Sequence, residues 1–458
     1  MSKIKSIYRC KECGKSSPKW LGKCPDCSAW NSFEEKIVEK TVSSQGISSF
    51  NGNPTKLVDI DVLNDRRIIT GDKEFDRVLG GGIVVDSVNI LSAPPGAGKS
   101  TLLLGIANRL AKKGINVLYA SGEESESQIK SRANRILKDD ISENLYVVSD
   151  PYKRLETIIE IDKVIDAKLI IIDSIQTFTL DRCLPSRAGS PTQVKECASE
   201  IVTLCKNKDN PKCSIIIGQM VKNDEIAGPR TLEHLVDAVF VLEGDNFDEM
   251  RLLYSNKNRF GTPEVGIYRM VEEGMIPVSN PSEAFITKRE NGEAVVGSAI
   301  TIIKEGSRPI AVEIESLISK SFTPYPTRLG EGIRKDQLNI LISILEQRGA
   351  QNLYDKNVIV KATGNLKLQE SSVGLAIVMS ITSSIYRIPI SPDIVFIAEL
   401  GLTGELKKAQ NIEQKIKEAE RMGFKTIIIP SQQVKTDSKI KILKMKDLVS
   451  VIKYIFNK

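Results

Sequence analysis

Residues 88–101 read VNILSAPPGAGKST and carry the clearest structural signal in this sequence. The stretch begins with an apolar run that suits a buried strand, continues through a Pro- and Gly-rich loop, and ends in Gly-Lys-Ser-Thr at the start of the apolar segment LLLGIANRL. The pattern matches the phosphate-binding loop GxxxxGK[ST], except that Ala93 replaces the first glycine. We expect backbone N–H groups of the loop and the dipole of the following helix to bind nucleotide phosphates. The stretch therefore predicts a nucleotide-binding α/β domain.

Within this loop, each residue type has an expected task. Lys99 is expected to neutralise phosphate charge, and Ser100 to bind Mg²⁺. Ala93 is compatible with the loop if its φ is negative, because only the left-handed region penalises a Cβ atom. The residues predicted to contact ATP are Ala93, Pro94, Pro95, Gly96, Ala97, Gly98, Lys99, Ser100 and Thr101.

Two further motifs follow apolar runs that read as strands. KLIIIDS, at residues 168–174, ends in Asp173, which we expect to hold the water shell of Mg²⁺. NVLYASGEES, at residues 116–125, has Glu123 and Glu124 directly after its apolar run. A carboxylate there is suited to orient the water that attacks the γ-phosphate. We favour Glu123, with Glu124 as the rival, and an exposed acidic turn remains the alternative for either.

The chain divides into regions by pattern. From about residue 66 to residue 272, short apolar runs alternate with amphipathic stretches, which predicts βαβ units and a buried parallel sheet. Polar segments at 36–65 and 273–290 read as linkers. Residues 291–458 form a second predicted α/β region. Its expected elements are paired strands in 294–303 and 308–317, further strands at 395–400 and 425–430, and helices at 334–348, 371–386 and 411–422.

Eight cysteines and one histidine set the metal chemistry that is possible. Two Cys-x-x-Cys pairs, Cys10 with Cys13 and Cys24 with Cys27, supply the four thiolates of a closed tetrahedral zinc site, so residues 1–35 are predicted to be a zinc finger. A redox dithiol is the alternative. Lysines around the pairs either contact phosphates or form a solvated face. The single histidine, His234, excludes any site with several histidines and is expected to pack or cap a helix.

The composition of the 458 residues is ordinary for a soluble globular protein, with 41% hydrophobic and 27% charged residues. Lys and Arg exceed Asp and Glu by 64 − 58 = 6, which permits a polyanionic partner without requiring one. No apolar run approaches the ~20 residues of a membrane span, and the first ten residues contain no signal-peptide segment. We therefore expect a cytoplasmic protein with no membrane partner.

Seven motifs occur in one order along the chain: CKECG with WLGKCPDCSAWNSF, DRVLGGG, GAGKSTLLL, YASGEES, IIIDSIQT, IAGPRTLEHLVD and KNRFG. Together they resemble the RadA (Sms) family of bacterial DNA repair proteins over nearly the whole chain. The resemblance implies an N-terminal zinc ribbon, a RecA-like P-loop ATPase core and a C-terminal Lon-protease-like α/β domain. It also implies ATP, Mg²⁺ and Zn²⁺ as cofactors, and hexameric rings that work with a RecA-type recombinase.

The activity that the resemblance implies is DNA-dependent ATP hydrolysis in recombinational repair. Such an enzyme translocates on single-stranded DNA and promotes branch migration of branched DNA. The alternative is an assembly factor that is switched by ATP and binds DNA or a recombinase without motor activity.

The resemblance also assigns roles to residues outside the phosphate loop. Lys257 and Arg259 of KNRFG, if on an extended edge, project from one side and either stabilise charge on a neighbouring subunit's γ-phosphate or contact DNA phosphates. A solvated basic turn is the remaining alternative. Gln219 stands where the family usually has His, and is expected to sense the γ-phosphate. The loops at 182–193 and 221–230 are either DNA-contacting channel loops or flexible surface loops without a ligand. Their predicted DNA-binding residues are Arg182, Arg187, Lys222 and Arg230.

Active Lon-like domains use a Ser-Lys dyad. Here Ser372 occupies the aligned position of the nucleophile, while Glu413 aligns with the lysine. Lys415 lies two residues further on, which rotates it by ~200° around a helix. On this alignment a peptidase is excluded, and residues 291–458 are expected to be an inactive scaffold. Candidates for contact with duplex DNA on this scaffold are Arg328, Arg334, Lys361 and Lys367.

Overall fold

The structure is a computed structural model of the chain. It describes residues 6–10, 16–17, 19–20, 22–25, 29–37, 56–59, 67–221, 225–226, 231–244, 249–289, 292–368 and 370–457. The chain divides into two compact units, Met1–Val62 and Leu63–Lys458.

The first unit contains a three-stranded antiparallel sheet in the order β2-β1-β3. Its elements are β1 (Ser6–Cys10), β2 (Ser16–Ser17), β3 (Phe33–Ile37) and the short 3₁₀ helix Leu57–Asp59. Its described core consists of Cys10, Cys24 and Phe33. A region of about 30 residues is generally too small to build a stable core without a metal ion or disulfides.

The second unit begins with a ten-stranded sheet in the order β15-β14-β13-β12-β6-β10-β9-β7-β8, with β11 paired to β10. Six central strands are parallel, which confirms the predicted βαβ arrangement. These strands are β6 (Val88–Ala93), β7 (Val117–Ser121), β8 (Leu145–Val148), β9 (Leu169–Asp173), β10 (Cys213–Val221) and β12 (Ala238–Glu243).

Antiparallel strands extend this sheet at one side. They are β13 (Met250–Asn258), β14 (Val265–Val271) and β15 (Gly274–Pro277). The short strand β11 (Glu225–Ile226) pairs with β10, and β4 (Arg67–Ile68) and β5 (Ile83–Val84) form a separate two-stranded sheet. The sheet therefore runs past residue 272, where the sequence predicted that the ATPase region ends. Pro277 suggested a linker there, but Gly274–Pro277 pairs with β14, and only Pro281 starts a new element, α7 (Pro281–Ala284).

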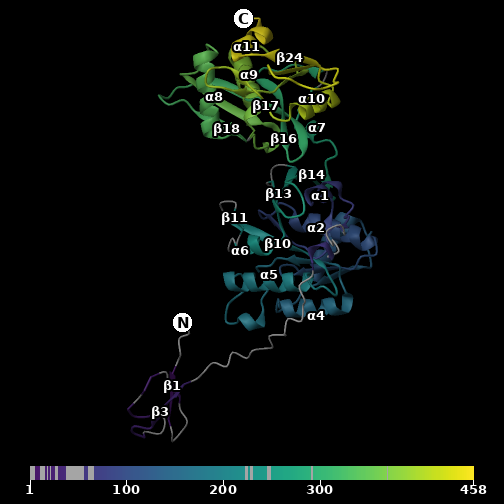
Figure 1. The fold of residues 1–458 in the computed structure, drawn as a ribbon, viewed down its shortest axis with the longest axis vertical. Helices are drawn as coiled ribbons and strands as arrows, with labels where there is room; N and C mark the ends of the chain where they lie inside the picture. The colour runs from purple at the N-terminus through teal and green to yellow at the C-terminus, as the bar shows by residue number, and fades with distance from the viewer. Residues whose placement is uncertain are drawn as a thin grey trace. The chain divides into compact units, whose positions relative to one another are not determined.

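Helices cover both faces of this sheet, as Figure 1 shows. One core packs the sheet against α1 (Lys73–Val78), α2 (Lys99–Lys112) and α3 (Glu126–Leu137). The other packs it against α4 (Leu155–Ile165), α5 (Pro191–Cys205) and α6 (Thr231–Leu235). Successive strand residues alternate between the two cores, as Ile170 and Ile171 do. The apolar runs are continuous because both faces are buried.

The C-terminal region contains a seven-stranded sheet in the order β18-β19-β17-β16-β20-β23-β24. Its strands are β16 (Ser298–Glu305), β17 (Arg308–Lys320), β18 (Arg328–Glu331), β19 (Lys356–Ala362), β20 (Ile394–Phe396), β23 (Thr426–Pro430) and β24 (Lys441–Met445). The predicted pairing of two strands after residue 294 is confirmed by the β16–β17 hairpin. A separate small sheet joins β21 (Glu399–Leu400) and β22 (Leu406–Lys407).

Helices α8 (Lys335–Arg348), α9 (Gly374–Tyr386) and α11 (Leu448–Phe456) contribute to one core of this region, and α10 (Ile412–Arg421) to the other. The three helices predicted from sequence correspond to α8, α9 and α10. None of the helices in the described part of the chain has both the length and the apolar character needed to cross a bilayer.

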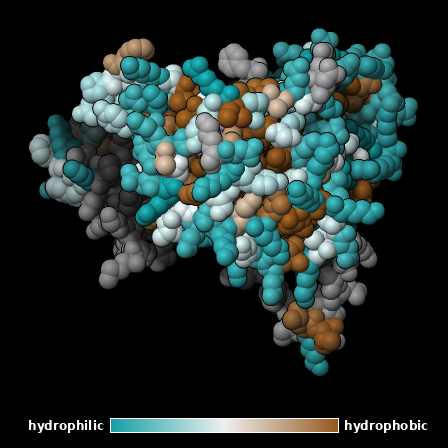
Figure 2. All heavy atoms as spheres, turned by 90° about the horizontal axis from the view of Figure 1, so that it is seen from above, coloured by the Kyte–Doolittle hydropathy of each residue, from teal (hydrophilic) through white to brown (hydrophobic). Residues whose placement is uncertain are grey.

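Part of the C-terminal sheet has an exposed face. Leu317, Ile359 and Leu329 lie in register on β17, β19 and β18, and each is exposed. In the next row Lys361 lies between Glu315 and Glu331, which lowers the positive potential that this lysine offers to DNA. Figure 2 shows hydrophobic side chains gathered in separate patches on a largely hydrophilic surface.

The tip of the β16–β17 hairpin contacts the ATPase sheet and α1. Nη1 of Arg308 lies 2.9 Å and 2.8 Å from the two carboxylate oxygens of Glu74, which is buried. The same carboxylate accepts a hydrogen bond from the Ile267 backbone N–H at 3.1 Å. The Ser307 N–H donates to Glu264 Oε2 at 3.2 Å. Charge and backbone contacts thus join the hairpin to the ATPase region.

We predict that Arg308→Ala lowers the free energy of unfolding by about 3 kcal/mol, because the buried carboxylate of Glu74 loses the cation that contacts both of its oxygens and keeps, among the described residues, only Arg77, at 3.7 Å. Urea unfolding followed by circular dichroism measures the change. The matched control is Lys288→Ala, whose ion pair with Glu283 is exposed and which should cause no measurable change. Equal unfolding midpoints for the two variants would contradict the assignment.

Candidate nucleotide-binding and catalytic site

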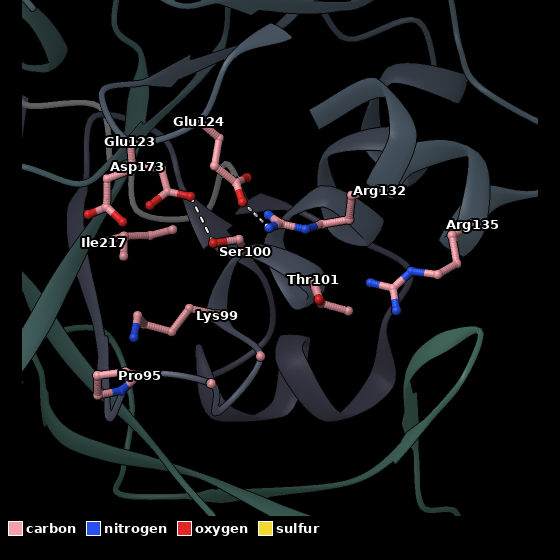
Figure 3. A pocket seen from close by; sticks show the side chains of 12 residues that line it. Pro95, Lys99, Ser100, Thr101, Glu123, Glu124, Arg132, Arg135, Asp173 and Ile217 are labelled. Carbon is pink, nitrogen blue, oxygen red and sulfur yellow. Dashed lines mark hydrogen bonds and ion pairs between the residues drawn. The ribbon is translucent and has the colours of Figure 1, made fainter. Parts of the chain in front are cut away.

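A pocket lies at the carboxyl edge of the parallel strands, where the loops after β6, β7 and β9 meet (Figure 3). This is the edge at which ligands bind in open α/β sheets, because parallel strands end there together. The residues lining the pocket are Pro95, Gly96, Gly98, Lys99, Ser100, Thr101, Glu123, Glu124, Arg132, Arg135, Asp173 and Ile217. The structure thus brings together most of the predicted phosphate-loop residues and all three predicted carboxylates.

The phosphate loop has the backbone that its glycines permit. Gly96 and Gly98 have φ values of 79° and 102°, in the left-handed region. A Cβ atom on Gly98 would lie 2.4 Å from Met270 Cε, which ends a flexible side chain that can move, so it is the positive φ that requires glycine there. Ala93 ends strand β6 and is not among the described residues with positive φ, which confirms that alanine is compatible with the loop.

Lys99 starts α2 and lies beside the loop. Its Nζ donates hydrogen bonds to the carbonyl oxygens of Ala93 at 2.9 Å and Pro94 at 3.1 Å. Burial lowers the pKa of the Lys99 ammonium group, while the nearby carboxylates of Asp173 and Glu123 act in the opposite direction. The Lys99 side chain therefore lies between the carbonyl groups of the loop and two acidic side chains.

Asp173 is the buried carboxylate at the centre of the pocket. Its Oδ2 accepts hydrogen bonds from Ser100 Oγ at 2.8 Å and from the Tyr119 hydroxyl at 2.5 Å. Burial raises the pKa of Asp173, and these two hydrogen bonds lower it. Ser100 and Asp173 were the two predicted magnesium ligands, and they lie in direct contact. Hydroxyl and carboxylate oxygens are the donors that Mg²⁺ prefers, so the residues present fit this ion.

The two glutamates after β7 have different partners. Glu123 Oε1 accepts a hydrogen bond from Ser174 Oγ at 2.5 Å, next to Asp173. Glu124 forms an ion pair with Arg132 of α3, which Figure 3 marks with a dashed line. Because an arginine engages the charge of Glu124, its carboxylate is less available to act on water. The geometry favours Glu123 for that task, as the sequence analysis did.

Sequence reasoning missed four residues of this site. Arg132 and Arg135 reach the pocket from α3, on the side of Thr101 in Figure 3. The Tyr119 hydroxyl contacts Asp173, and the buried Arg251 of β13 donates from Nε to the Ala97 carbonyl at 3.1 Å. An arginine and a tyrosine inside otherwise apolar strands were the available signal, since buried polar groups need partners.

Lys257 and Arg259 lie at the amino ends of the parallel strands, whereas the pocket lies at their carboxyl ends. Lys257 Nζ donates to the Val236 carbonyl at 2.8 Å, and Arg259 pairs with the buried Asp237 at 3.1 Å. Asp237 directly precedes β12 and accepts from the N–H of Val88, the first residue of β6. The six residues of β6 span about 17–20 Å from its amino end, beside Asp237, to Ala93 at its carboxyl end. The structure therefore does not bring either cation to the phosphate loop of its own chain.

The expectation that KNRFG forms an edge holds only in part. Strand β13, which ends at Asn258, lies between β12 and β14 in the sheet. Its last residues pair with β12, while its pairing with β14 covers Met250–Tyr254. Both cations nevertheless lie beside Asp237, Arg259 through an ion pair at 3.1 Å and Lys257 through the carbonyl oxygen of the preceding residue, Val236.

The predicted DNA-contacting residues are only partly described. Lys222 and Arg230 lie outside the described residues, as does the side chain of Gln219, whose backbone pairs with Ala93. Arg187 is exposed, and Arg182 pairs with Glu200 at 2.7 Å and Glu196 at 3.7 Å. DNA contact by these residues stays a prediction. His234 is exposed in the last turn of α6, so of the two expected roles packing is wrong and capping stays a prediction.

In the first unit, Cys10 and Cys24 are both buried in the small core. The Cys10 thiol lies 3.2 Å from Ser32 Oγ. Cys13 and Cys27 lie outside the described residues. Two buried thiols that share one core suit a closed zinc site, because zinc takes thiolate ligands in the interior of a small domain.

The predicted alignment of the C-terminal region is wrong at one position. Lys415, and not Glu413, lies beside Ser372, with Nζ 2.9 Å from Oγ. Ile412, Ile416 and Ala419 form the buried face of α10, and Lys415 lies on that face with 0% of its surface exposed. The sequence analysis excluded a serine–lysine pair because Lys415 was expected to lie on the other side of the helix from the serine. The contact between Lys415 and Ser372 contradicts that reason.

Together, a parallel sheet with a phosphate loop at its carboxyl edge, the Ser100–Asp173 pair and the two flanking modules define a RecA-like P-loop ATPase with an N-terminal zinc ribbon and a C-terminal Lon-protease-like domain. Family models agree in each region: a rubredoxin metal binding domain matches residues 8–35, an AAA domain 54–199, and the ChlI subunit of Mg-chelatase 331–433. The chain belongs to the DNA repair protein RadA family.

The relatives that show this are similar over almost their whole length. DNA repair protein RadA of Bacillus subtilis is 41% identical over 94% of this chain and 93% of its own. The Campylobacter jejuni protein of the same name is 39% identical over 99% and 100%. Among solved structures, a KaiC-like protein from Pyrococcus horikoshii covers 46% of this chain and 99% of its own at 18% identity, with a TM-score of 0.38.

We predict that Tyr119→Phe impairs ATP hydrolysis chiefly at low pH. The lost hydrogen bond lowers the pKa of Asp173 in the native protein, so its removal raises that pKa and protonates the carboxylate at a higher pH. The acid limb of the pH–rate profile should move upward by about one pH unit, the equivalent of a hydrogen bond to a charged group. Tyr146→Phe, on the neighbouring strand β8, is the control. An unchanged acid limb would show that Tyr119 does not tune Asp173.

Proposed function

We propose that this protein is a DNA-dependent ATPase of recombinational DNA repair that translocates on single-stranded DNA and promotes branch migration. The observation that carries the proposal is the pocket in which Lys99, Ser100 and Asp173 meet, with Glu123 beside them. Membership of a DNA repair family supports DNA as the partner.

In the proposed reaction, bound MgATP supplies the phosphoanhydride bond and the divalent charge that neutralises it. The hydroxyl of Ser100 and the carboxylate of Asp173 hold the ion, and Lys99 neutralises phosphate charge. Glu123 orients the attacking water. The hydrogen bond from Ser174 fixes the Glu123 carboxylate, so the base needs little reorganisation during the reaction.

Lys257 and Arg259 are proposed to act on the neighbouring subunit's ATP in a hexameric ring. Both cations lie at the end of the parallel strands that is far from the phosphate loop of their own chain. This position supports the role, because a head-to-tail ring joins two different surfaces of consecutive subunits. Asp237 holds Arg259 in place there.

DNA contact is proposed for Arg182, Arg187, Lys222 and Arg230 in the two loops, with Lys257 and Arg259 as further candidates. Cationic loops without aromatic residues suit contact with the DNA backbone. The four cysteines Cys10, Cys13, Cys24 and Cys27 are proposed to hold zinc, whose binding free energy would stabilise the small head. A RecA-type recombinase is the proposed protein partner.

The central experiment measures the ATP hydrolysis rate with and without single-stranded DNA. We expect DNA to stimulate the wild-type protein, and Lys99→Ala to lower the stimulated rate by about 100-fold or more, because a preorganised charge at the phosphate is lost. Lys113→Ala, at the other end of α2, is the matched control.

Retained turnover in Lys99→Ala would contradict the site, and an absence of DNA stimulation would contradict the DNA-dependent activity. A branch-migration assay then tests the motor. DNA-stimulated hydrolysis without movement of the branch would instead support the ATP-switched assembly.

Mixing two inactive variants tests the action of Arg259 between subunits. Arg259→Ala keeps its phosphate loop, and Lys99→Ala keeps its arginine. If the arginine acts on a neighbour, mixed rings should regain hydrolysis at about a quarter of their sites. Arg269→Ala, on the neighbouring strand β14, should be active alone. Failure of the two variants to complement each other would exclude the action between subunits.

A further inference from the structure

The chain contains two tryptophans, and both are exposed in the first unit, outside its core. Trp20 and Trp30 have 51% and 72% of their surfaces exposed, and the described core of Cys10, Cys24 and Phe33 includes neither of them. A single exposed apolar side chain needs no explanation. Two exposed indoles in one small unit are different, because tryptophan is enriched where a surface binds another molecule.

Backbone contacts hold the two indoles on one short segment of the chain. Lys23 and Trp30 form an antiparallel bridge, and beside it the Asn31 N–H donates to the Gly22 carbonyl at 2.9 Å. The ring of Trp20 lies next to Gly22, where a Cβ atom would be 3.7 Å from Cζ3 of the indole. The two rings therefore belong to one local structure and not to two independent loops.

Cations accompany the two rings. The Nζ of Lys23 lies 5.6 Å from the centroid of the Trp30 ring, which is within the range of a cation–π contact. Lys19 and Lys23 are exposed, and neither forms an ion pair with any residue that the structure describes. The sequence around them is basic, since residues 1–24 contain Lys3, Lys5, Arg9, Lys11, Lys15, Lys19 and Lys23 against the single acidic residue Glu12. The charge of this surface is complementary to a polyanion.

Exposed aromatic rings beside free cations suit one class of polyanion, a single-stranded nucleic acid. Its unpaired bases stack on aromatic side chains while its phosphates contact lysines and arginines. A duplex fits less well, because its bases are paired and stacked inside the helix. A protein partner also fits less well, because lysine is depleted at the centre of protein–protein interfaces.

We propose that the first unit is a base-stacking site for single-stranded DNA. Trp20 and Trp30 stack on unpaired bases, and Lys19 and Lys23 contact the adjoining phosphates. That the strand is DNA rests on the proposed function. The site differs in chemistry from the loops at 182–193 and 221–230, which contain no aromatic residue and are proposed to contact only the DNA backbone.

Tryptophan fluorescence reports on this site directly, because the chain has no tryptophan elsewhere. The full chain, loaded with zinc, is titrated with an oligothymidylate and with an abasic strand of equal length. The abasic strand carries the same phosphates but no bases. We expect the oligothymidylate to quench the emission, because a base stacks on the indole, and the abasic strand to leave it unchanged. Equal quenching by the two strands, or quenching by neither, would overturn the proposal.

Affinity for the same two strands, measured by the anisotropy of a label on the DNA, gives a second test. Trp30→Ala should raise the Kd for the oligothymidylate by at least about fivefold, which is the low end for the loss of one stacked base, and should leave the Kd for the abasic strand unchanged. Tyr354→Ala is the matched control, because this aromatic side chain is 79% exposed but lies in the C-terminal region. Bound zinc reports whether the first unit of Trp30→Ala folds. An unchanged Kd in the zinc-loaded variant contradicts the proposal, and if the variant does not bind zinc, the comparison of the two strands on the wild type decides.

DNA-stimulated ATP hydrolysis in the same samples separates this proposal from the proposed function. Stimulation by the oligothymidylate without quenching would overturn the stacking site and leave the DNA-dependent ATPase intact. Quenching without stimulation would support the stacking site and contradict the DNA-dependent ATPase. Emission that changes with the concentration of the protein, and not with DNA, would show that a second copy of the chain covers the rings, which also overturns the proposal.

Discussion

The ATPase site depends on one buried carboxylate, that of Asp173, and on the two hydroxyl groups that stabilise its charge. An unpaired carboxylate inside the sheet would be strongly disfavoured, and burial already raises its pKa. Ser100 and Tyr119 offset this cost from the phosphate-loop helix and from strand β7. The carboxylate of Asp173 thus connects strand β9 with strand β7 and with the first turn of α2. The phosphate loop and the two glutamates lie around it.

Local sequence was enough to predict the parts of the site that depend on neighbours in the chain. The phosphate loop, Asp173 at the end of its strand and the parallel sheet all follow from short motifs and periodicity, because strand, loop and helix succeed each other within a few residues. Tyr119 and Arg251 were not predicted, since their partners are distant in the chain and depend on strand order. No local pattern specifies that β6 lies between β10 and β12.

The error at Lys415 has a different cause. The alignment compared residue types at assumed equivalent positions and gave the lysine position to Glu413. The periodicity of α10 contains the correct answer, because Ile412, Ile416 and Ala419 define a buried face that also includes Lys415. A lysine on the apolar face of an amphipathic helix needs a buried partner, and that requirement was a stronger guide than the alignment.

Strand β13 contacts the segments at both ends of the parallel strands of the ATPase sheet. Arg251, near its beginning, holds the Ala97 carbonyl of the phosphate loop, and Lys257, near its end, contacts the backbone beside Asp237. Arg251 and Lys257 therefore belong to one continuous strand, although its pairing with β12 has a register shift between them. In the proposed ring, the backbone of β13 would be the shortest covalent path from the phosphate loop of one ATP site to the cations at the next.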